Sequence, residues 1–317
     1  MNSHETAQWL KARDHFLILT HRRPDGDTLG SAAGLAQGLK AAGKTAFILF
    51  NPEATARYTS YVQQHWAPDG YLPSYVITVD MASLDLFPSN AERYKTDVAL
   101  CIDHHPSNTG YANSLCLDAE KASCGEIIYE VILALMGNIS ADTAAALYVA
   151  VSTDTGCFAF SNTNANALRV AAALADAGAP IGEINKSIFR TKAKSRMMIE
   201  AMIITGMSFH FDGAVAMATI TRKMMAQTGA GENEMDDVAA IPNGIEGVLV
   251  GITIRELTGP KDCKVSIRTS SIVNANTLAS QFGGGGHAMA SGFSLKASAE
   301  EIKKLLLRAL GELFPLK

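Results

Sequence analysis

The sequence predicts an α/β fold, in which an N-terminal domain with a mostly parallel sheet flanked by helices precedes a smaller C-terminal α/β domain. Short apolar runs alternate with helical patterns through the first 190 residues, and from residue 209 the pattern changes to alternating strands. A chain of 317 residues is comfortable for two cores. We expect domains at 1–190 and 209–317, connected by a helix at 191–208.

Hydrophobic residues make up 48% of the chain and charged residues 18%, which is typical of a folded soluble protein. No apolar run approaches the roughly 18 residues that span a bilayer, and the first residues lack the pattern of a signal peptide. We therefore expect a cytoplasmic protein without a membrane partner. The five cysteines are scattered and form no C-x-x-C pair, which predicts reduced thiols rather than disulfides or structural zinc.

Charge is divided unevenly along the chain. Residues 1–190 contain 13 basic and 19 acidic side chains, a net charge of −6, whereas residues 191–317 contain 14 and 12, a net charge of +2. This modest excess of cations suits a nucleotide or short RNA. It falls far short of the basic surface with which proteins hold long duplex DNA.

A histidine and two aspartates follow the first predicted strand, at residues 16–20. His21, Asp25 and Asp27 stand on a proline- and glycine-containing turn before a helix predicted at 29–42, so their side chains can converge. Helix capping would need only one of the acids. It leaves the second acid and the histidine unexplained.

Two later strands, predicted at 75–79 and 98–102, also end in acids or imidazoles. These residues are Asp80, Asp103, His104 and His105. The carboxyl ends of parallel strands meet at one edge of the sheet, where open α/β folds bind their ligands. The pattern therefore predicts one site built from several strand ends.

Asp154 adds a further carboxylate, at the exit of a helix predicted at 141–152. A carboxylate is electrostatically disfavoured at that end of a helix, so we expect Asp154 to face a cation. Clustering so many carboxylates would be costly without cations. Two divalent ions would relieve the repulsion, and a carboxylate-rich site with some imidazoles and no thiolate favours manganese or magnesium. Two ions about 3.5–4 Å apart would suit phosphoester hydrolysis.

The C-terminal part begins with a helix at 192–206, whose methionines we interpret as packing. The remaining predicted elements are strands at 209–211, 215–221, 248–256, 263–269 and 292–295, and helices at 275–282 and 298–314. The run Gly283-Gly284-Gly285-Gly286-His287 lies between the predicted helix at 275–282 and the predicted strand at 292–295. Consecutive glycines allow backbone N–H groups to approach an anion closely.

The site segments resemble, in order, the four motifs of the DHH phosphoesterase family. They are His21-Arg22-Arg23-Pro24-Asp25-Gly26-Asp27, Asp80, Asp103-His104-His105 and Ser152-Thr153-Asp154-Thr155-Gly156. Two further segments, Val265-Ser266-Ile267-Arg268-Thr269 and the glycine-histidine run, look like the substrate-binding domain associated with that family. The resemblance covers nearly the whole chain. Size and the lack of extra domains indicate the nanoRNase group of bifunctional oligoribonucleases and pAp phosphatases.

This resemblance implies two bound Mn²⁺ ions, for which Mg²⁺ or Co²⁺ could substitute. The family pattern assigns one ion to His21, Asp25 and Asp80, and the other to Asp27, Asp80, His104 and Asp154. Asp80 would then bridge the two ions.

The family pattern also implies roles toward the substrate, in an active site that would lie in the cleft between the domains. His105 would face the phosphate as a hydrogen-bond donor or general acid, and Asp103 would orient an imidazole. Arg268 would hold a terminal phosphate, and His287 would contact a phosphate or a base. The glycines lining the phosphate path would be Gly284, Gly285 and Gly286.

The implied activity is hydrolysis of short oligoribonucleotides to nucleoside 5′-monophosphates, with pAp to AMP as a second reaction. Two alternatives stay open: a phosphodiesterase for cyclic dinucleotides or linear pApA, and a non-catalytic nucleotide-binding module. The oligomeric state is also open, with a homodimer as one option. The chain departs from many members at Leu86, where a basic residue is common, at Thr269 and at Asn274. These departures bear on substrate preference rather than on metal ligands.

Overall fold

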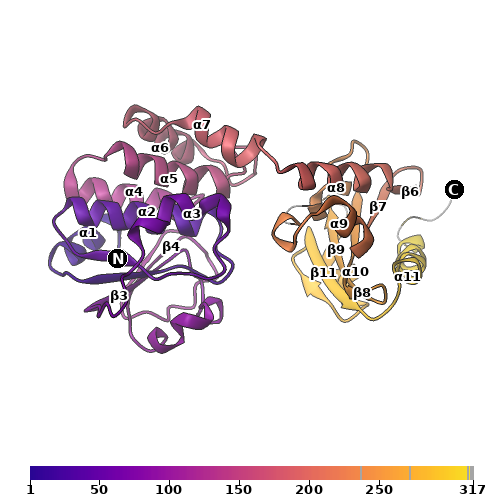
Figure 1. The fold of residues 1–317 in the computed structure, drawn as a ribbon, viewed down its shortest axis with the longest axis horizontal. Helices are drawn as coiled ribbons and strands as arrows, with labels where there is room; N and C mark the ends of the chain where they lie inside the picture. The colour runs from indigo at the N-terminus through magenta and orange to yellow at the C-terminus, as the bar shows by residue number, and fades with distance from the viewer. Residues whose placement is uncertain (236–237, 271–272, 313, 315–317) are drawn as a thin grey trace. The chain divides into compact units, whose positions relative to one another are not determined.

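The computed structural model describes residues 1–235, 238–270, 273–312 and 314. By its internal contacts the chain divides into two compact units, Met1–Thr191 and Lys192–Lys317 (Figure 1). Each unit contains one sheet, and each is described by itself. Among the described residues, no helix is both long and apolar enough to cross a membrane.

The first unit contains a five-stranded, entirely parallel sheet with the strand order β2-β1-β3-β4-β5. The strands are β1 (Phe16–Leu19), β2 (Ala46–Ile48), β3 (Tyr75–Val79), β4 (Val98–Asp103) and β5 (Leu115–Leu117). All four residues of β1 are buried, as expected of a strand covered on both faces. This arrangement confirms the predicted α/β fold with a parallel sheet.

Helices cover one face of this sheet (Figure 1). The helices of the unit are α1 (Ser3–Lys11), α2 (Gly26–Ala41), α3 (Ala56–Val62), α4 (Cys124–Met136), α5 (Ala141–Asp154), α6 (Ala165–Asp176) and α7 (Ile181–Asn185). The other face packs against shorter segments, including the 3-10 turns η2 (Leu84–Leu86) and η3 (Ser89–Tyr94). Helices α1 and α3 were not predicted.

Close packing of α2 on α5 brings two site segments together. A Cβ added to Gly30 of α2 would lie 2.5 Å from the carbonyl oxygen of Ala146 in α5, so the two backbones approach as only glycine permits. Helix α2 begins at Gly26 rather than near residue 29, because Asp25 caps it by accepting a hydrogen bond from the N–H of Thr28. The start of α2 therefore lies beside the end of α5.

The second unit contains a six-stranded sheet with the order β10-β11-β9-β8-β7-β6, in which β7 and β8 are parallel and the other pairs antiparallel. Its strands are β6 (Ser208–His210), β7 (Val215–Ile220), β8 (Val250–Gly259), β9 (Asp262–Thr269), β10 (Gly285–Gly286) and β11 (Ala290–Leu295). Its helices are α8 (Lys194–Thr205), α9 (Arg222–Thr228), α10 (Ala275–Ser280) and α11 (Ala299–Gly311). The predicted C-terminal helix extended through residue 313, which lies outside the described residues.

Helix α8, which falls in the segment expected to connect the domains, packs within the second unit. Ile199 and Ile203 are buried against Ala218 and the rest of a small cluster on β7. The expected packing of the methionine face is wrong for Met197 and Met198, which are 57% and 46% exposed. The isoleucines at i and i+4 form the buried stripe instead.

Candidate metal centre

The predicted site residues of the first unit gather at the carboxyl edge of its sheet. His21 follows β1, Asp25 and Asp27 begin α2, and Asp80 follows β3. The residues contributed by β4 and α5 are Asp103, His104, His105 and Asp154. Three groups of these side chains have ligand atoms within 4.8 Å of one another: His21 with Asp25 and Asp80, Asp27 with His104 and Asp154, and Asp80 with His104 and His105.

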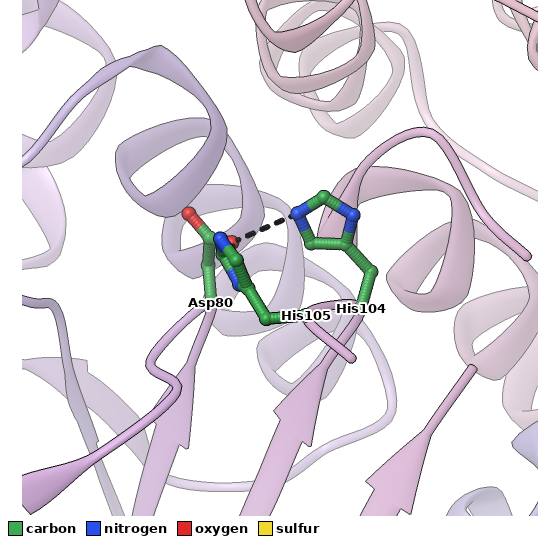
Figure 2. Close-up of side chains that lie close together, drawn as sticks. All are labelled: Asp80, His104 and His105. Atoms are coloured by element: carbon green, nitrogen blue, oxygen red, sulfur yellow. Dashed lines mark ion pairs between the residues drawn. The ribbon is translucent and has the colours of Figure 1, made fainter. Parts of the chain in front are cut away.

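Asp80 lies between the two histidines that belong to different groups. Its Oδ2 is 3.7 Å from Nε2 of His21, and its Oδ1 is 3.4 Å from Nε2 of His104 (Figure 2). The side chain is 3% exposed, and Oδ1 has no hydrogen-bond partner among the described residues. The backbone has a left-handed φ of 55°, which is uncommon for a residue other than glycine. A buried carboxylate oxygen without a donor, facing two imidazoles, suits coordination of a cation.

The first group is organised around His21. Its Nδ1 lies 2.8 Å from the carbonyl oxygen of Arg22, so this bond holds the Nδ1 proton and directs Nε2 toward the acids. Asp25 Oδ1 lies 3.7 Å from that Nε2 while it also caps α2. Asp25 can therefore cap α2 and line the site at the same time.

The second group is organised around His104. Its Nδ1 lies 3.2 Å from the carbonyl oxygen of Lys121, and its Nε2 lies 3.7 Å from both Asp27 Oδ2 and Asp154 Oδ2. Asp27 is 1% exposed and accepts hydrogen bonds from the N–H groups that begin α4, at 2.7 and 3.0 Å. A helix N-terminus stabilises an anion, so the amides of α4 favour the charged form of this carboxylate against the effect of its burial.

His105 is held differently from the other two histidines. Its Nδ1 donates to Asp103 Oδ1 at 2.8 Å, and Asp103 is fully buried. Although His105 Nδ1 is 3.5 Å from Asp80, the bond to Asp103 occupies that nitrogen, so we do not count it among the metal ligands. Its Nε2 remains available, because the side chain is 41% exposed. Asn108, which was not predicted, donates to the other oxygen of Asp103 at 2.6 Å.

Burial and neighbouring charges shift the pKa values of the histidines and aspartates at the centre. Burial opposes charge on both imidazoles, but hydrogen bonds and charges of the neighbouring aspartates outweigh it and raise the pKa of His21 and His104 to about 10. Burial raises the pKa of Asp154 to about 6, and burial with the charges of Asp80 and Asp154 raises that of Asp27 well above its usual range. The carboxylates repel one another, so protons stay bound to some of these acids and to the neighbouring imidazoles. This behaviour is expected of a site that is completed by metal cations.

Asp103 and His105 form a separate pair. Burial would raise the pKa of Asp103, but hydrogen bonds from His105 and Asn108 hold it below its usual value. The bond to Asp103 in turn raises the pKa of His105. The contact therefore favours a charged carboxylate and a protonated imidazole.

We expect Asn108→Ala to lower the free energy of unfolding by about 1–3 kcal/mol, because it leaves a buried oxygen of Asp103 without its donor. Asn108→Asp should destabilise more, because it sets a second carboxylate against the first. Urea unfolding would measure both effects. Asn113→Ala is the matched control, since Asn113 is exposed and only its backbone N–H is bonded, to Val98. Equal stability of the Asn108 and Asn113 variants would contradict this account.

A cavity of about 380 Å³ opens at the centre. It is lined by His21, Arg22, Arg23, Asp25, Asp80, Leu86, His105 and Asp154. The residues present fit divalent metal: they are carboxylates and imidazoles with no thiolate, Nδ1 of His21 and of His104 is bonded to a backbone carbonyl so that Nε2 faces the acids, and Asp80 carries an orphaned oxygen. Leu86 forms part of the cavity wall.

The predicted substrate residues of the second unit lie on neighbouring strands. Arg268 of β9 pairs with Ala290 of β11, and His287 lies in the tight turn between β10 and β11, where its N–H donates to the carbonyl of Ala290. The glycine run is partly strand: Gly285 and Gly286 form β10. His287 is exposed and Arg268 partly so.

The glycines of this run are required for different reasons, which gives a paired prediction. A Cβ on Gly284 would lie 2.3 Å from the carbonyl oxygen of Gly292, whereas one on Gly285 would meet nothing nearer than Asn276 Oδ1 at 3.7 Å. We expect Gly284→Ala to lower the melting temperature of the second unit by several degrees, on the order of 2 kcal/mol of strain. Gly285→Ala is the matched control and should unfold like the wild type in calorimetry. Equal melting of the two variants would contradict the close approach.

The fold and the site define a class of protein: a two-unit α/β chain whose first unit can hold divalent metal ions. Residues 15–151 match the N-terminal domain of the DHH family, and residues 212–314 match the DHHA1 domain. The chain belongs to the DHH family of phosphoesterases and is a hydrolase acting on phosphoester bonds.

Relatives match nearly the whole chain. A bifunctional oligoribonuclease and PAP phosphatase NrnA from Thermus thermophilus is 32% identical over 281 residues, covering 88% of this chain and 83% of that protein. Another protein of the same name, from Bacillus subtilis, is 26% identical over 300 residues, covering 92% of each. The crystal structure of an exopolyphosphatase-related protein from Bacteroides fragilis shares the fold, with a TM-score of 0.84 and 22% identity over 99% of this chain and 96% of that one.

Proposed function

We propose that this protein is a manganese-dependent phosphoesterase that hydrolyses short oligoribonucleotides to nucleoside 5′-monophosphates and removes a phosphate from pAp. The observation that carries the proposal is the position of Asp80, which belongs to the group of His21 and lies 3.4 Å from His104 of the group of Asp27. The relatives from Thermus thermophilus and Bacillus subtilis, which are named oligoribonuclease and PAP phosphatase, support the choice of substrates.

In this proposal His21, Asp25 and Asp80 hold one ion, and the second ion takes Asp27, Asp80, His104 and Asp154. When bound, two such ions supply an activated water and neutralise charge on the phosphate. The protein fixes the orientation of the ligand side chains. The proton of each ligating imidazole is held by a backbone carbonyl, and two amides of α4 fix Asp27.

His105 acts in this proposal as the hydrogen-bond donor or general acid toward the phosphate. Asp103 holds its Nδ1 and stabilises the protonated ring, so Nε2–H is the proton that a substrate oxygen can accept. Asn108 fixes Asp103 from behind. The chain of hydrogen bonds orients the donor before the substrate binds.

The second unit would bind the remainder of the substrate. Arg268 has planar donors that match a terminal phosphate, and exposed His287 can contact a phosphate or a base. Of the predicted glycines, Gly285 is the one whose Cβ position is open, so it is the best placed to let a ligand approach the backbone.

Product analysis on diadenylate without a terminal phosphate (ApA), in the presence of manganese, tests the proposal. We expect adenosine and AMP as the products, and AMP from pAp in a parallel reaction. Cyclic di-AMP and pApA complete the substrate panel. Binding of diadenylate without cleavage would indicate the non-catalytic alternative, and cleavage of cyclic di-AMP in clear preference to diadenylate would overturn the proposed substrate class.

A further inference from the structure

The cavity at the metal centre contains two arginines whose surroundings differ. Arg23 is 87% exposed in its side chain, and its Nε lies 4.0 Å from Glu53 Oε2, so a neighbouring carboxylate offsets its charge. Arg22 is exposed, and its guanidinium has no ion-pair or hydrogen-bond partner within the described part of the chain. The guanidinium of Arg22 is therefore available to a ligand.

The backbone of Arg22 is anchored on both sides. Its N–H donates to the carbonyl of Leu86 at 2.6 Å, and its own carbonyl accepts the Nδ1 proton of His21 at 2.8 Å. One peptide group is thus attached to the cavity wall and the next to a histidine of the site. The side chain consequently starts from a fixed position at the cavity, beside an apolar wall residue.

Charge balance shows why such a cation is needed. The carboxylates that face the centre are Asp25, Asp27, Asp80 and Asp154. Their four negative charges would balance the four positive charges of two divalent ions, so excess positive charge toward a phosphodiester has to come from other side chains. His105 is already paired with the carboxylate of Asp103. Of the described residues lining the cavity, Arg22 is the cation without a carboxylate to neutralise it.

We propose that Arg22 binds a non-bridging oxygen of the scissile phosphate. This inference rests on the proposed function, and it assigns a substrate-binding role to a residue outside the ligand groups. The planar guanidinium matches phosphate oxygens, and a donor aimed at the reacting group stabilises the charge of the transition state. Because the scissile phosphate is common to all substrates, Arg22 acts on phosphodiesters and phosphomonoesters alike.

Kinetics of Arg22→Ala with two substrates test the assignment. Diadenylate carries bases and sugars, whereas bis(4-nitrophenyl) phosphate offers the protein only a scissile phosphate with aromatic leaving groups. We expect kcat/KM with manganese to fall by a similar factor on both, about 10- to 100-fold, and Arg22→Lys to recover part of the loss. The matched control is Arg169→Ala, which removes an exposed arginine of α6 outside the cavity lining and should stay within about two-fold of wild type.

Equilibrium binding gives a second readout that does not depend on turnover. Calorimetry with AMP, whose phosphate is the product of the scissile group, should show weaker binding by Arg22→Ala. The dependence of Kd on salt concentration should also become weaker, because one charge pair with the phosphate is lost. Loss on diadenylate alone would place Arg22 at a base or sugar rather than at the scissile phosphate and overturn the assignment, as would unchanged kinetics and binding. A wild-type protein that cleaves neither substrate would instead contradict the proposed function itself.

Discussion

Asp80→Asn is expected to lower kcat on diadenylate by about 10³-fold or more, because it removes the one charge shared by both ligand groups and each 1.36 kcal/mol of lost stabilisation costs a factor of ten. The substitution keeps the volume of the side chain, so it tests charge rather than packing. Steady-state kinetics with manganese would measure the effect. Asp176→Asn is the matched control, since Asp176 is an exposed residue of α6.

The same substitution should also abolish most of the stabilisation by manganese. In the metal-free protein the charge of Asp80 has opposed effects, because it repels Asp27 and Asp154 but pairs with His21 and His104. We expect manganese to raise the urea midpoint of the wild type and to change that of Asp80→Asn little. Undiminished turnover, or equal stabilisation of both proteins by manganese, would contradict the bridging role of Asp80.

The second large expected effect is the release of protons when metal binds. His21 and His104 have a pKa of about 10 in the protein alone, so both are protonated at pH 7.5, whereas a ligating imidazole must be neutral at Nε2. We expect binding of two manganese ions at pH 7.5 to release about two protons from these imidazoles. The apparent affinity should rise with pH and level off above about 10. Calorimetric titration in buffers of different ionisation enthalpy would count the protons.

The stability of the metal-free protein should decrease as the pH rises, in contrast to the affinity for metal. A raised histidine pKa means that the ion pairs with the acids stabilise the fold fully below the unfolded pKa of about 6.5, and that this contribution is lost as the pH rises through about 10. The metal-free protein should therefore lose stability between pH 7 and pH 10, while metal affinity increases. Binding that releases no protons, or metal affinity that falls with rising pH, would contradict the ligand assignment.

Much of the site could be predicted because the ends of buried strands can be recognised in the sequence. His21, Asp80 and Asp103 each follow an apolar run, and parallel strands bring their carboxyl ends to one edge whatever the loops do. The helix exit at Asp154 was readable from helix electrostatics. These local rules were enough to predict which side chains of the first unit meet.

Other features depend on contacts that no local pattern encodes. The start of α4 supplies amides to Asp27, about one hundred residues earlier in the chain. Asn108 lies three residues after His105, a signal that could have suggested its role, but asparagine in a loop is more often a turn residue. The pairing of Gly285 and Gly286 with β11 is likewise set by the sheet, so a glycine run that reads as a loop forms a short strand.

A manganese anomalous difference map from crystals of the metal-loaded protein tests the central claim most directly. The account predicts two peaks per chain about 3.5–4 Å apart, one beside His21 and Asp25, the other beside Asp27, His104 and Asp154, and both in contact with Asp80. A single peak held by Asp80, His104 and His105, which would displace the bond between His105 and Asp103, would contradict it.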